Sequence, residues 1–328
     1  MDRRTREKYS DGLLGEAAAR YGIDRSSVAE LGGFENFVFH CRHEGVERIL
    51  RIAHSLRRSW EQVSAELDWL AYLAAEGLAV SPAVPSLRGS LCEKVGEADD
   101  YFTATVFEKA PGKPADDITW GADLFSEMGR LMGRMHALTK GYQPPVTGRR
   151  PSWHEESDGF AARYLPAGNE AIVARDCELA ERMRALPAGR DAFGLVHLDF
   201  HRGNFLVDRG RVRLFDFDDC QYSWFADDIA VALFYALPHD CRSAQGQEKA
   251  RAFLRPFLDA YGRENELGEE WLQRIPLFLK RREIDLYVVI HRSVDLSDPS
   301  EWTATFLDGR AERIEDGVPY ADIESIEL

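Results

Sequence analysis

A histidine, two aspartates and an asparagine stand at a spacing that could perform phosphoryl transfer. His197, Asp199 and Asn204 form the pattern H-x-D-x-x-x-x-N, and Asp216 follows twelve positions after Asn204, directly behind an apolar run. A carboxylate can accept the proton of an attacking hydroxyl. A second carboxylate and an amide oxygen suit Mg²⁺, a hard cation that takes its remaining ligands from water and nucleotide phosphates. Phosphoryl transfer requires mainly positioning and charge neutralisation, and these residues could supply both.

The residues belong to a predicted β-hairpin and to the loop before it. The apolar runs 205–207 and 212–215 flank the turn signal Asp-Arg-Gly, which is typical of a hairpin. Asn204 and Asp216 are then expected at the same end of two paired strands, and Asp199 precedes them on the loop. This arrangement favours a cation site next to a group that can accept a proton.

This stretch resembles the catalytic and metal-binding loops of the aminoglycoside phosphotransferase and choline kinase group, which is related to the protein kinases. In that group the loop and strand are followed by an Asp-Leu-Ala-like element, which here is Asp228-Ile-Ala. The resemblance implies Asp199 as catalytic base and Asn204 with Asp216 as magnesium ligands. It also implies that Asp228 braces the catalytic loop. His197 is expected to be structural rather than catalytic.

Two earlier stretches resemble the nucleotide-binding elements of the same group. Gly32 and Gly33 stand between two predicted strands, where their amides could approach phosphates, although a simple hairpin is the alternative. Arg51 stands where relatives usually carry a phosphate-contacting lysine, and its planar guanidinium is not equivalent to an ammonium. Glu66 lies near the apolar stripe of the helix that begins at Ser59. An inward carboxylate needs a cation, so Arg51 is the predicted partner, with a solvent-facing glutamate as the alternative.

A break after the alternating run 101–107 separates the strand-rich and helix-rich parts. In kinase-like folds this is the hinge whose backbone groups hold adenine, and the resemblance assigns Glu108 and Ala110 to it, without a side-chain signature. Asp218 and Asp219 are either further carboxylates on the metal side or a solvated turn, and the turn is favoured.

The predicted elements are strands with one main helix first, then helices around the small hairpin. Strands are predicted near residues 28–31, 37–41, 48–52, 85–87 and 101–107. Helices are predicted over residues 7–20, 59–77, 121–138, 171–186, 229–237, 245–261 and 269–291. This order indicates a two-lobed α+β fold. With the resemblance, we predict a protein-kinase-like fold with a small antiparallel-sheet N-terminal lobe (1–109) and a larger, mainly helical C-terminal lobe (110–328).

Charge and composition narrow the class of protein. The net charge of −15 argues against a nucleic-acid partner, and 45% hydrophobic with 30% charged residues is typical of a soluble globular protein. No run approaches the length of a membrane span and no signal peptide is evident, so no membrane association and a cytoplasmic location are expected. The five cysteines lack C-x-x-C spacing and are expected to be reduced thiols.

The predicted function is an ATP- and Mg²⁺-dependent phosphotransferase that moves the γ-phosphate to a hydroxyl of a small molecule, with GTP as the alternative donor. Acceptors of the aminoglycoside, amino alcohol, homoserine or sugar type are all compatible with the fold. One alternative is a Ser/Thr protein kinase, which the short segment between Asp216 and Asp228 disfavours. The other is a catalytically idle nucleotide-binding pseudokinase, which Arg51 suggests. Acceptor recognition is expected around residues 153–156 and 222–224 and in the helices after residue 269, and the sequence does not indicate the oligomeric state.

Overall fold

A computed structural model of the chain describes residues 3–145, 148–237 and 243–321. The chain forms two compact units, and the first contains segments from both sides of residue 110, whereas all of the second follows that residue. The first unit consists of residues 1–112, 142–150 and 213–218. The second consists of residues 113–141, 151–212 and 219–328. The chain passes from the first unit to the second after residue 112, close to the predicted lobe boundary. Residues 142–150 and 213–218 then return to the first unit.

An antiparallel sheet forms the centre of the first unit. Its strands run in the order β1-β2-β3-β6-β4, and β5 also pairs with β6. The strands are β1 (Ala29–Glu30), β2 (Phe37–His43), β3 (Val46–His54), β4 (Ala83–Val84), β5 (Cys92–Gly96) and β6 (Tyr101–Glu108). Arg51 of β3 pairs with Val38 on β2 and with Thr105 on β6. Arg51 therefore lies in a central strand, with neighbours on both sides.

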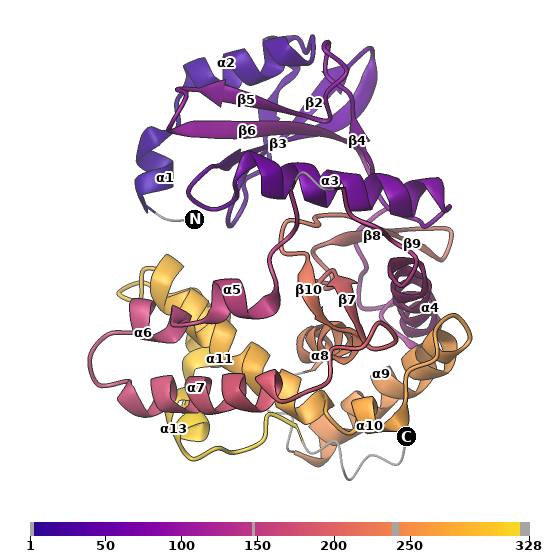
Figure 1. Ribbon diagram of the computed structural model, residues 1–328, viewed down its shortest axis with the longest axis vertical. Helices are drawn as coiled ribbons and strands as arrows, with labels where there is room; N and C mark the ends of the chain where they lie inside the picture. The colour runs from indigo at the N-terminus through magenta and orange to yellow at the C-terminus, as the bar shows by residue number, and fades with distance from the viewer. Residues whose placement is uncertain (1–2, 146–147, 238–242, 322–328) are drawn as a thin grey trace. The chain divides into compact units, whose positions relative to one another are not determined.

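Different helices cover the two faces of this sheet (Figure 1). The buried Leu14 of α2 (Asp11–Arg20) belongs to one apolar cluster with Leu50 and Ile52 of β3. Because side chains alternate along a strand, Arg51 points to the other face, where α3 (Trp60–Ala75) lies. The chain also has a short α1 (Arg3–Lys8) and a 3₁₀ turn (Arg25–Ser27).

The strand predicted at residues 85–87 is wrong. The strand ends one residue earlier, Pro85 has no amide hydrogen to pair, and the Ser86 side chain accepts amide hydrogens from Arg88 and Ser90. These bonds turn the chain before β5. Strand β5 was not predicted, because its five residues include the charged Glu93 and Lys94 and give only a weak alternating pattern.

The second unit contains two small sheets. β7 (Phe193–Val196) pairs with β10 (Gln221–Trp224), and β8 (Phe205–Asp208) pairs with β9 (Arg211–Leu214). The last two residues of β9 are assigned to the first unit. Arg209 and Gly210, which connect β8 to β9, have positive φ angles of 51° and 76°, as a type I′ turn requires. The predicted hairpin is therefore confirmed, whereas the β7–β10 pair was not predicted.

Helices surround these sheets. α4 (Ala122–Thr139) buries the predicted apolar stripe, and ten of the twelve residues of α8 (Phe225–Ala236) are buried. The other helices are α5 (Trp153–Ser157), α6 (Phe160–Tyr164), α7 (Glu170–Arg184), α9 (Ala244–Gly262), α10 (Glu269–Leu272), α11 (Ile275–Ser293), α12 (Glu301–Leu307) and α13 (Arg310–Glu315). The single helix predicted over 269–291 is two helices, because Pro276 lies in the first turn of α11 and starts a new helix.

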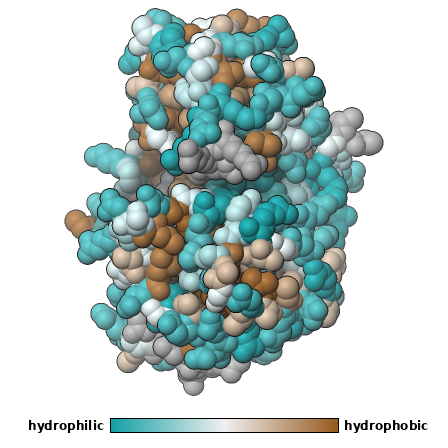
Figure 2. Space-filling model, turned by 90° about the vertical axis from the view of Figure 1, so that its left-hand side faces the viewer, coloured by the Kyte–Doolittle hydropathy of each residue, from teal (hydrophilic) through white to brown (hydrophobic). Residues whose placement is uncertain are grey.

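The hydropathy of one face of the molecule is drawn in Figure 2. This face is mainly hydrophilic, and its hydrophobic residues gather in a few areas. Within the described ranges, no helix has both the length and the apolar character needed to cross a bilayer. Four of the five cysteines, Cys41, Cys92, Cys177 and Cys220, are free thiols, and Cys241 lies outside the described residues.

Candidate active site

The loop between β7 and β8 carries Asp199, and Asp228 from α8 holds this loop in place. The Asp228 carboxylate accepts the backbone N–H of His197 at 3.1 Å and that of Leu198 at 2.7 Å. Leu198 has a φ of 60°, which is unfavourable for a residue with a branched side chain. The two charge-assisted hydrogen bonds offset this strain and determine where the next residue, Asp199, is placed.

A buried chain of hydrogen bonds holds Asp228 in turn. Asn265 donates to the Tyr261 hydroxyl at 2.7 Å, this hydroxyl lies 2.8 Å from His136 Nδ1, and His136 Nε2 lies 3.0 Å from Asp228. Burial would raise the pKa of Asp228, but His136 keeps it below its usual range. Burial also lowers the pKa of His136. A neutral His136 that donates from Nε2 and accepts at Nδ1 satisfies every member of this chain.

Both carboxylate oxygens of Asp199 accept hydrogen bonds within the second unit. Asn204 Nδ2 donates to Oδ2 at 2.7 Å, and His201 Nε2 lies 3.2 Å from the same oxygen. Arg282 Nη2 donates to Oδ1 at 3.1 Å. The Gly203 amide donates to His201 Nδ1 at 2.9 Å, so Nε2 is the nitrogen that carries a hydrogen toward Asp199. A Cβ at Gly203 would lie 2.6 Å from this ring, so a larger residue there would displace His201.

These partners control the ionisation of Asp199. Burial alone would raise the pKa of Asp199, but the hydrogen bond from His201 and the charge of Arg282 outweigh burial and lower it to about 2. A carboxylate with so low a pKa is a weak proton acceptor in the ground state, because an efficient general base has a pKa near the working pH. Asp199 is therefore suited above all to orienting a hydroxyl. His197 is fully buried, and its Nδ1 accepts the Asp199 amide hydrogen at 3.2 Å.

The sequence analysis did not select three of the side chains in this cluster. His201 stands two positions after Asp199 in the same short loop, and this short spacing could have indicated that the two side chains lie close together. Arg282 of α11 and Tyr235 of α8 are far from the loop in sequence, and Arg282 Nη2 donates to the Tyr235 hydroxyl at 2.7 Å. No local pattern predicts these two contacts, because they depend on how α8 and α11 pack.

The first unit contains its own charged cluster around Arg51. Arg51 Nη2 donates to Glu66 Oε2 at 2.8 Å, and both side chains are buried. Arg51 Nη1 lies 3.7 Å from Asp216 and 3.9 Å from Asp218. Burial would lower the pKa of Arg51, but Glu66 and Asp218 raise it above its usual range. The guanidinium thus joins the α3 carboxylate to the segment that carries Asp216.

Asp218 is the centre of this cluster, and the solvated turn predicted for it is wrong. Only 4% of Asp218 is exposed, and its carboxylate accepts from Arg57 Nε at 2.8 Å. Its backbone carbonyl accepts from Arg58 at 3.1 Å and from Arg150 at 2.6 Å. Burial would raise the pKa of Asp218, but Arg57 and the other guanidinium groups hold it far below its usual range. These contacts anchor the chain directly after Asp216, which has a φ of 61°.

The predicted glycine turn and hinge also lie in the first unit. Gly32 has a φ of 80°, and a Cβ at Gly33 would lie 2.1 Å from the Asn36 carbonyl oxygen, so the turn itself requires these glycines. Glu108 is the last residue of β6, and its amide donates to the Pro82 carbonyl at 2.9 Å. Contacts from these residues, or from Ala110, to a nucleotide remain predictions.

The two predicted magnesium ligands are on different units, Asn204 on the second and Asp216 on the first. Among the residues that the structure describes, no group of three or more His, Cys, Asp or Glu side chains could hold a metal by itself. The donor chemistry nevertheless fits a hard cation. The Asn204 NH₂ group is committed to Asp199, which leaves its oxygen for a metal, and the buried Asp218 Oδ1 has no hydrogen-bond partner.

A small cavity of about 60 Å³ lies beside the catalytic loop. Its lining includes Leu198 from the loop, Asp227 from α8, Arg282 and Asp285 from α11, and Trp153 from α5. Trp153 belongs to the stretch expected to recognise the acceptor. Asp227 is buried and accepts the Ser223 hydroxyl at 2.6 Å. Burial, together with the nearby Asp285 and Asp228, raises the pKa of Asp227 to about 7.

The raised pKa of Asp227 predicts a specific pH dependence of stability. The folded protein keeps a proton on Asp227 that the unfolded chain loses near pH 4, so the stability that this proton contributes is lost as the pH rises through about 7. Relative to Asp227→Asn, we expect the wild-type free energy of unfolding to fall by about 2–3 kcal/mol between pH 5 and pH 8. Urea unfolding at both pH values measures this difference. The exposed Asp316→Asn is the matched control, and equal pH dependence of wild type and Asp227→Asn would contradict the assignment.

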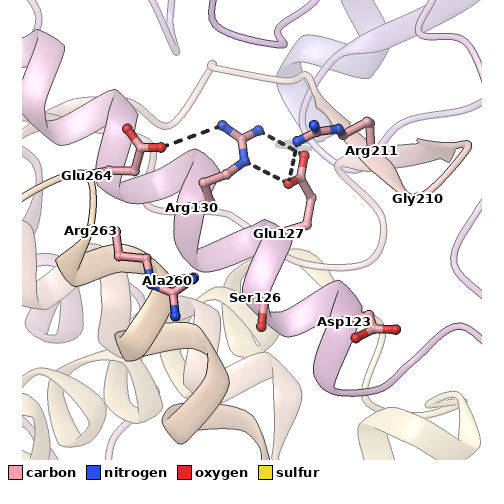
Figure 3. Close-up of a pocket in the computed structure, with 9 residues that line it drawn as sticks. All are labelled: Asp123, Ser126, Glu127, Arg130, Gly210, Arg211, Ala260, Arg263 and Glu264. Carbon is pink, nitrogen blue, oxygen red and sulfur yellow. Dashed lines mark hydrogen bonds and ion pairs between the residues drawn. The ribbon is translucent and has the colours of Figure 1, made fainter.

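A second pocket of about 340 Å³ lies elsewhere in the same unit, between α4, α9 and the β8–β9 turn (Figure 3). Glu127 is ion-paired with Arg130 at 2.8 Å and with Arg211 at 3.2 Å, and Arg130 is 3.9 Å from Glu264. None of the predicted site residues lines this pocket. Unlike the cavity beside the catalytic loop, it is lined by no residue of that loop.

Solved structures define the class of protein to which this fold belongs. The amicoumacin kinase hAmiN, in a complex with AMP-PNP, Ca²⁺ and Ami, has a TM-score of 0.90 to this chain at 34% identity, covering 98% of each chain. The aminoglycoside phosphotransferase APH(4)-Ia has a TM-score of 0.59 at 16% identity, over 94% of this chain and 99% of that chain, a similarity of fold alone. The chain therefore has the two-lobed protein-kinase-like α+β fold that the sequence predicted.

Sequence comparison then identifies the family. The model of the phosphotransferase enzyme family, APH, matches residues 27–267. The amicoumacin kinase of Bacillus subtilis (strain 168) is 37% identical over 318 residues, which are 95% of this chain and 94% of the relative. A homoserine kinase of Cupriavidus taiwanensis is 26% identical over 254 residues, which are 72% of this chain and 73% of that relative. The chain belongs to the APH phosphotransferase family and is a phosphotransferase that acts on an alcohol group of a small molecule.

Proposed function

We propose that this protein is an ATP- and Mg²⁺-dependent kinase that phosphorylates a hydroxyl group of amicoumacin or of a closely related small molecule. The observation that carries the proposal is the catalytic loop, in which an ionised Asp199 is held by Asn204, His201 and Arg282. The 37% identity to an amicoumacin kinase, over 95% of this chain, supports amicoumacin as the first acceptor to test.

The first unit contributes the groups for the nucleotide. Arg51, fixed by Glu66, is the cation for the phosphates, and the Gly32–Gly33 turn supplies backbone amides that could face them. Backbone groups of residues 108–110 hold the adenine in this proposal. The bound AMP-PNP of hAmiN supports an adenine nucleotide as the donor.

Asn204 and Asp216 are the proposed protein ligands of the divalent cation. When bound, the cation neutralises charge on the β- and γ-phosphate oxygens during transfer. The Ca²⁺ in the hAmiN complex supports a divalent cation site, and we propose Mg²⁺ as the ion used in catalysis because it suits phosphate chemistry with few protein ligands.

Asp199 acts on the acceptor. Its carboxylate accepts a hydrogen bond from the acceptor hydroxyl and aligns that oxygen with the γ-phosphorus. As the new oxygen–phosphorus bond forms, the bond to the β-phosphate oxygen breaks and ADP leaves. The hydroxyl proton passes to Asp199 as the hydroxyl oxygen loses its electron pair to phosphorus.

ADP release from Mg-ATP tests the proposal. The assay compares amicoumacin with separate pools of amino alcohols, aminoglycosides, amino acids, sugars and nucleosides, and uses Asp199→Asn as the blank. A rate that rises with amicoumacin in the wild type alone, and that EDTA removes, supports the proposal. If another pool gives the rise, amicoumacin is not the acceptor. If every pool gives the same rate as the blank while ATP still binds, the small-molecule kinase proposal is replaced by an idle nucleotide-binding module or by a kinase with a protein acceptor.

A further inference from the structure

Arg57 connects two segments of the first unit that the proposed function uses separately. Its Nη1 lies 3.6 Å from Glu35 Oε2, and its Nε donates to Asp218 Oδ2 at 2.8 Å. Glu35 belongs to the glycine turn, which we define as residues 31–36 between β1 and β2, and Asp218 stands two positions after Asp216. All of these residues belong to the first unit. One guanidinium therefore links the glycine turn to the segment that carries a proposed metal ligand.

The Asp218 end of this link is fixed by other contacts. Asp218 is buried, and its backbone carbonyl accepts from Arg58 Nε at 3.1 Å and from Arg150 Nη2 at 2.6 Å. The side chains of Arg57 and Glu35 are 19% and 18% exposed, so water reaches their ion pair only in part. Because the hydrogen bond to Asp218 already restricts the Arg57 side chain, pairing with Glu35 costs little additional conformational entropy. The link therefore holds Glu35 against a fixed point.

The glycine turn is tight enough for a contact at Glu35 to restrain its neighbouring amides. Gly32 has a φ of 80°, and a Cβ at Gly33 would lie 2.1 Å from the Asn36 carbonyl oxygen. Glu35 also brings a negative charge into a turn whose amides are proposed to face phosphates. An unpaired carboxylate there would repel a nucleotide, and the Arg57 guanidinium supplies the opposite charge.

We infer that Arg57 is a positioning residue for the nucleotide: it holds the glycine turn through Glu35, fixes it to the segment of Asp216, and neutralises the charge that Glu35 brings. The inference rests on the proposed function, because it requires the turn amides to face the β- and γ-phosphates. It assigns Arg57 an effect on the binding of nucleotides that carry these phosphates, and none on the binding of AMP, which lacks them.

The test uses two substitutions that keep the charge and break the link. Glu35→Asp shortens a side chain whose ion pair already spans 3.6 Å, and Arg57→Lys replaces the guanidinium fork by a single ammonium. We expect each variant to bind AMP-PNP with Mg²⁺ about 3- to 5-fold more weakly, as for the loss of a partly exposed ion pair, and AMP with unchanged affinity. Because both changes break the same link, the double variant should bind AMP-PNP no more weakly than the weaker single variant. Glu76→Asp, an exposed change of the same chemistry in the same unit, is the matched control and should alter neither affinity.

A second measurement needs no nucleotide. The ¹⁵N order parameters of the backbone amides of residues 32–36 report their motion, and they should be lower in Glu35→Asp and in Arg57→Lys than in the wild type. Order parameters at the wild-type values in both variants would overturn the inference. An equal loss of affinity for AMP-PNP and for AMP would also overturn it, because that result indicates a structural role alone. If the wild type binds neither nucleotide, the proposed function fails and the inference fails with it, whereas variants that bind AMP-PNP as tightly as the wild type refute the inference alone.

Discussion

Replacing Asp199 with asparagine is expected to lower the rate of phosphoryl transfer by about 10²- to 10⁴-fold, the range typical for a group that accepts a proton in the transition state. The structure gives a second reason for a large effect. Both oxygens of Asp199 receive hydrogen bonds, from Arg282 on one side and Asn204 on the other. Asparagine has one side-chain acceptor, so its NH₂ group must face one of these donors, and the side chain loses its orientation.

A measurement of nucleotide binding distinguishes this loss of turnover from general damage to the fold. The proposed nucleotide groups Arg51 and Glu66 belong to the first unit, whereas Asp199 belongs to the second. Asp199→Asn should therefore bind ATP with nearly the wild-type Kd, measured by calorimetry, while ADP release falls. Asp191→Asn, an exposed change of the same chemistry in the same unit, should retain wild-type turnover. Turnover by Asp199→Asn within a few-fold of wild type would remove Asp199 from the proposed role.

The local part of this site was predictable because it depends on short-range patterns. The hairpin could be predicted from two apolar runs around Asp-Arg-Gly, and the structure has a tight turn at Arg209 and Gly210. The inward position of Glu66 followed from helical periodicity, and α3 does bury this residue completely. In both cases the side-chain direction is set by local backbone geometry.

The rest depended on tertiary packing. Asp218 reads as part of an acidic, solvated turn, but arginines from two distant segments surround it and make its burial possible. Arg282 reaches Asp199, and Tyr235 reaches Arg282, because α8 and α11 pack together, and the spacing along either helix carries no sign of these contacts. The sequence could likewise not show that residues 142–150 and 213–218 belong to the first unit, since pattern analysis assigns elements and not their contacts.

The arginine in place of the usual lysine can now be interpreted by its contacts. Arg51 Nη2 bonds Glu66 while Nη1 faces Asp216 and Asp218. A guanidinium presents donors in two directions, whereas an ammonium is a single compact charge. The substitution therefore fits a site in which one cation serves several carboxylates, and it does not by itself indicate an idle module.

Replacing Arg51 with methionine is expected to have two separable effects. Only 4% of Arg51 and none of Glu66 is exposed, so the variant leaves a buried carboxylate without its cation. Breaking a buried ion pair from one side typically costs about 3–5 kcal/mol in the free energy of unfolding, which urea unfolding measures. The affinity for ATP should fall about 10- to 100-fold, because a hydrogen bond to a charged group contributes about 1.5–3 kcal/mol.

The double variant Arg51→Met with Glu66→Leu distinguishes these effects. Leucine at position 66 continues the apolar stripe of α3 formed by Val63 and Leu70, and replacing both members of a buried pair by apolar side chains is often neutral. We expect the double variant to recover most of the lost stability but none of the lost ATP affinity. Arg42→Met, an exposed change in the same unit, should alter neither property. Wild-type ATP affinity in the stable double variant would show that Arg51 is a structural cation and that the phosphates are held elsewhere.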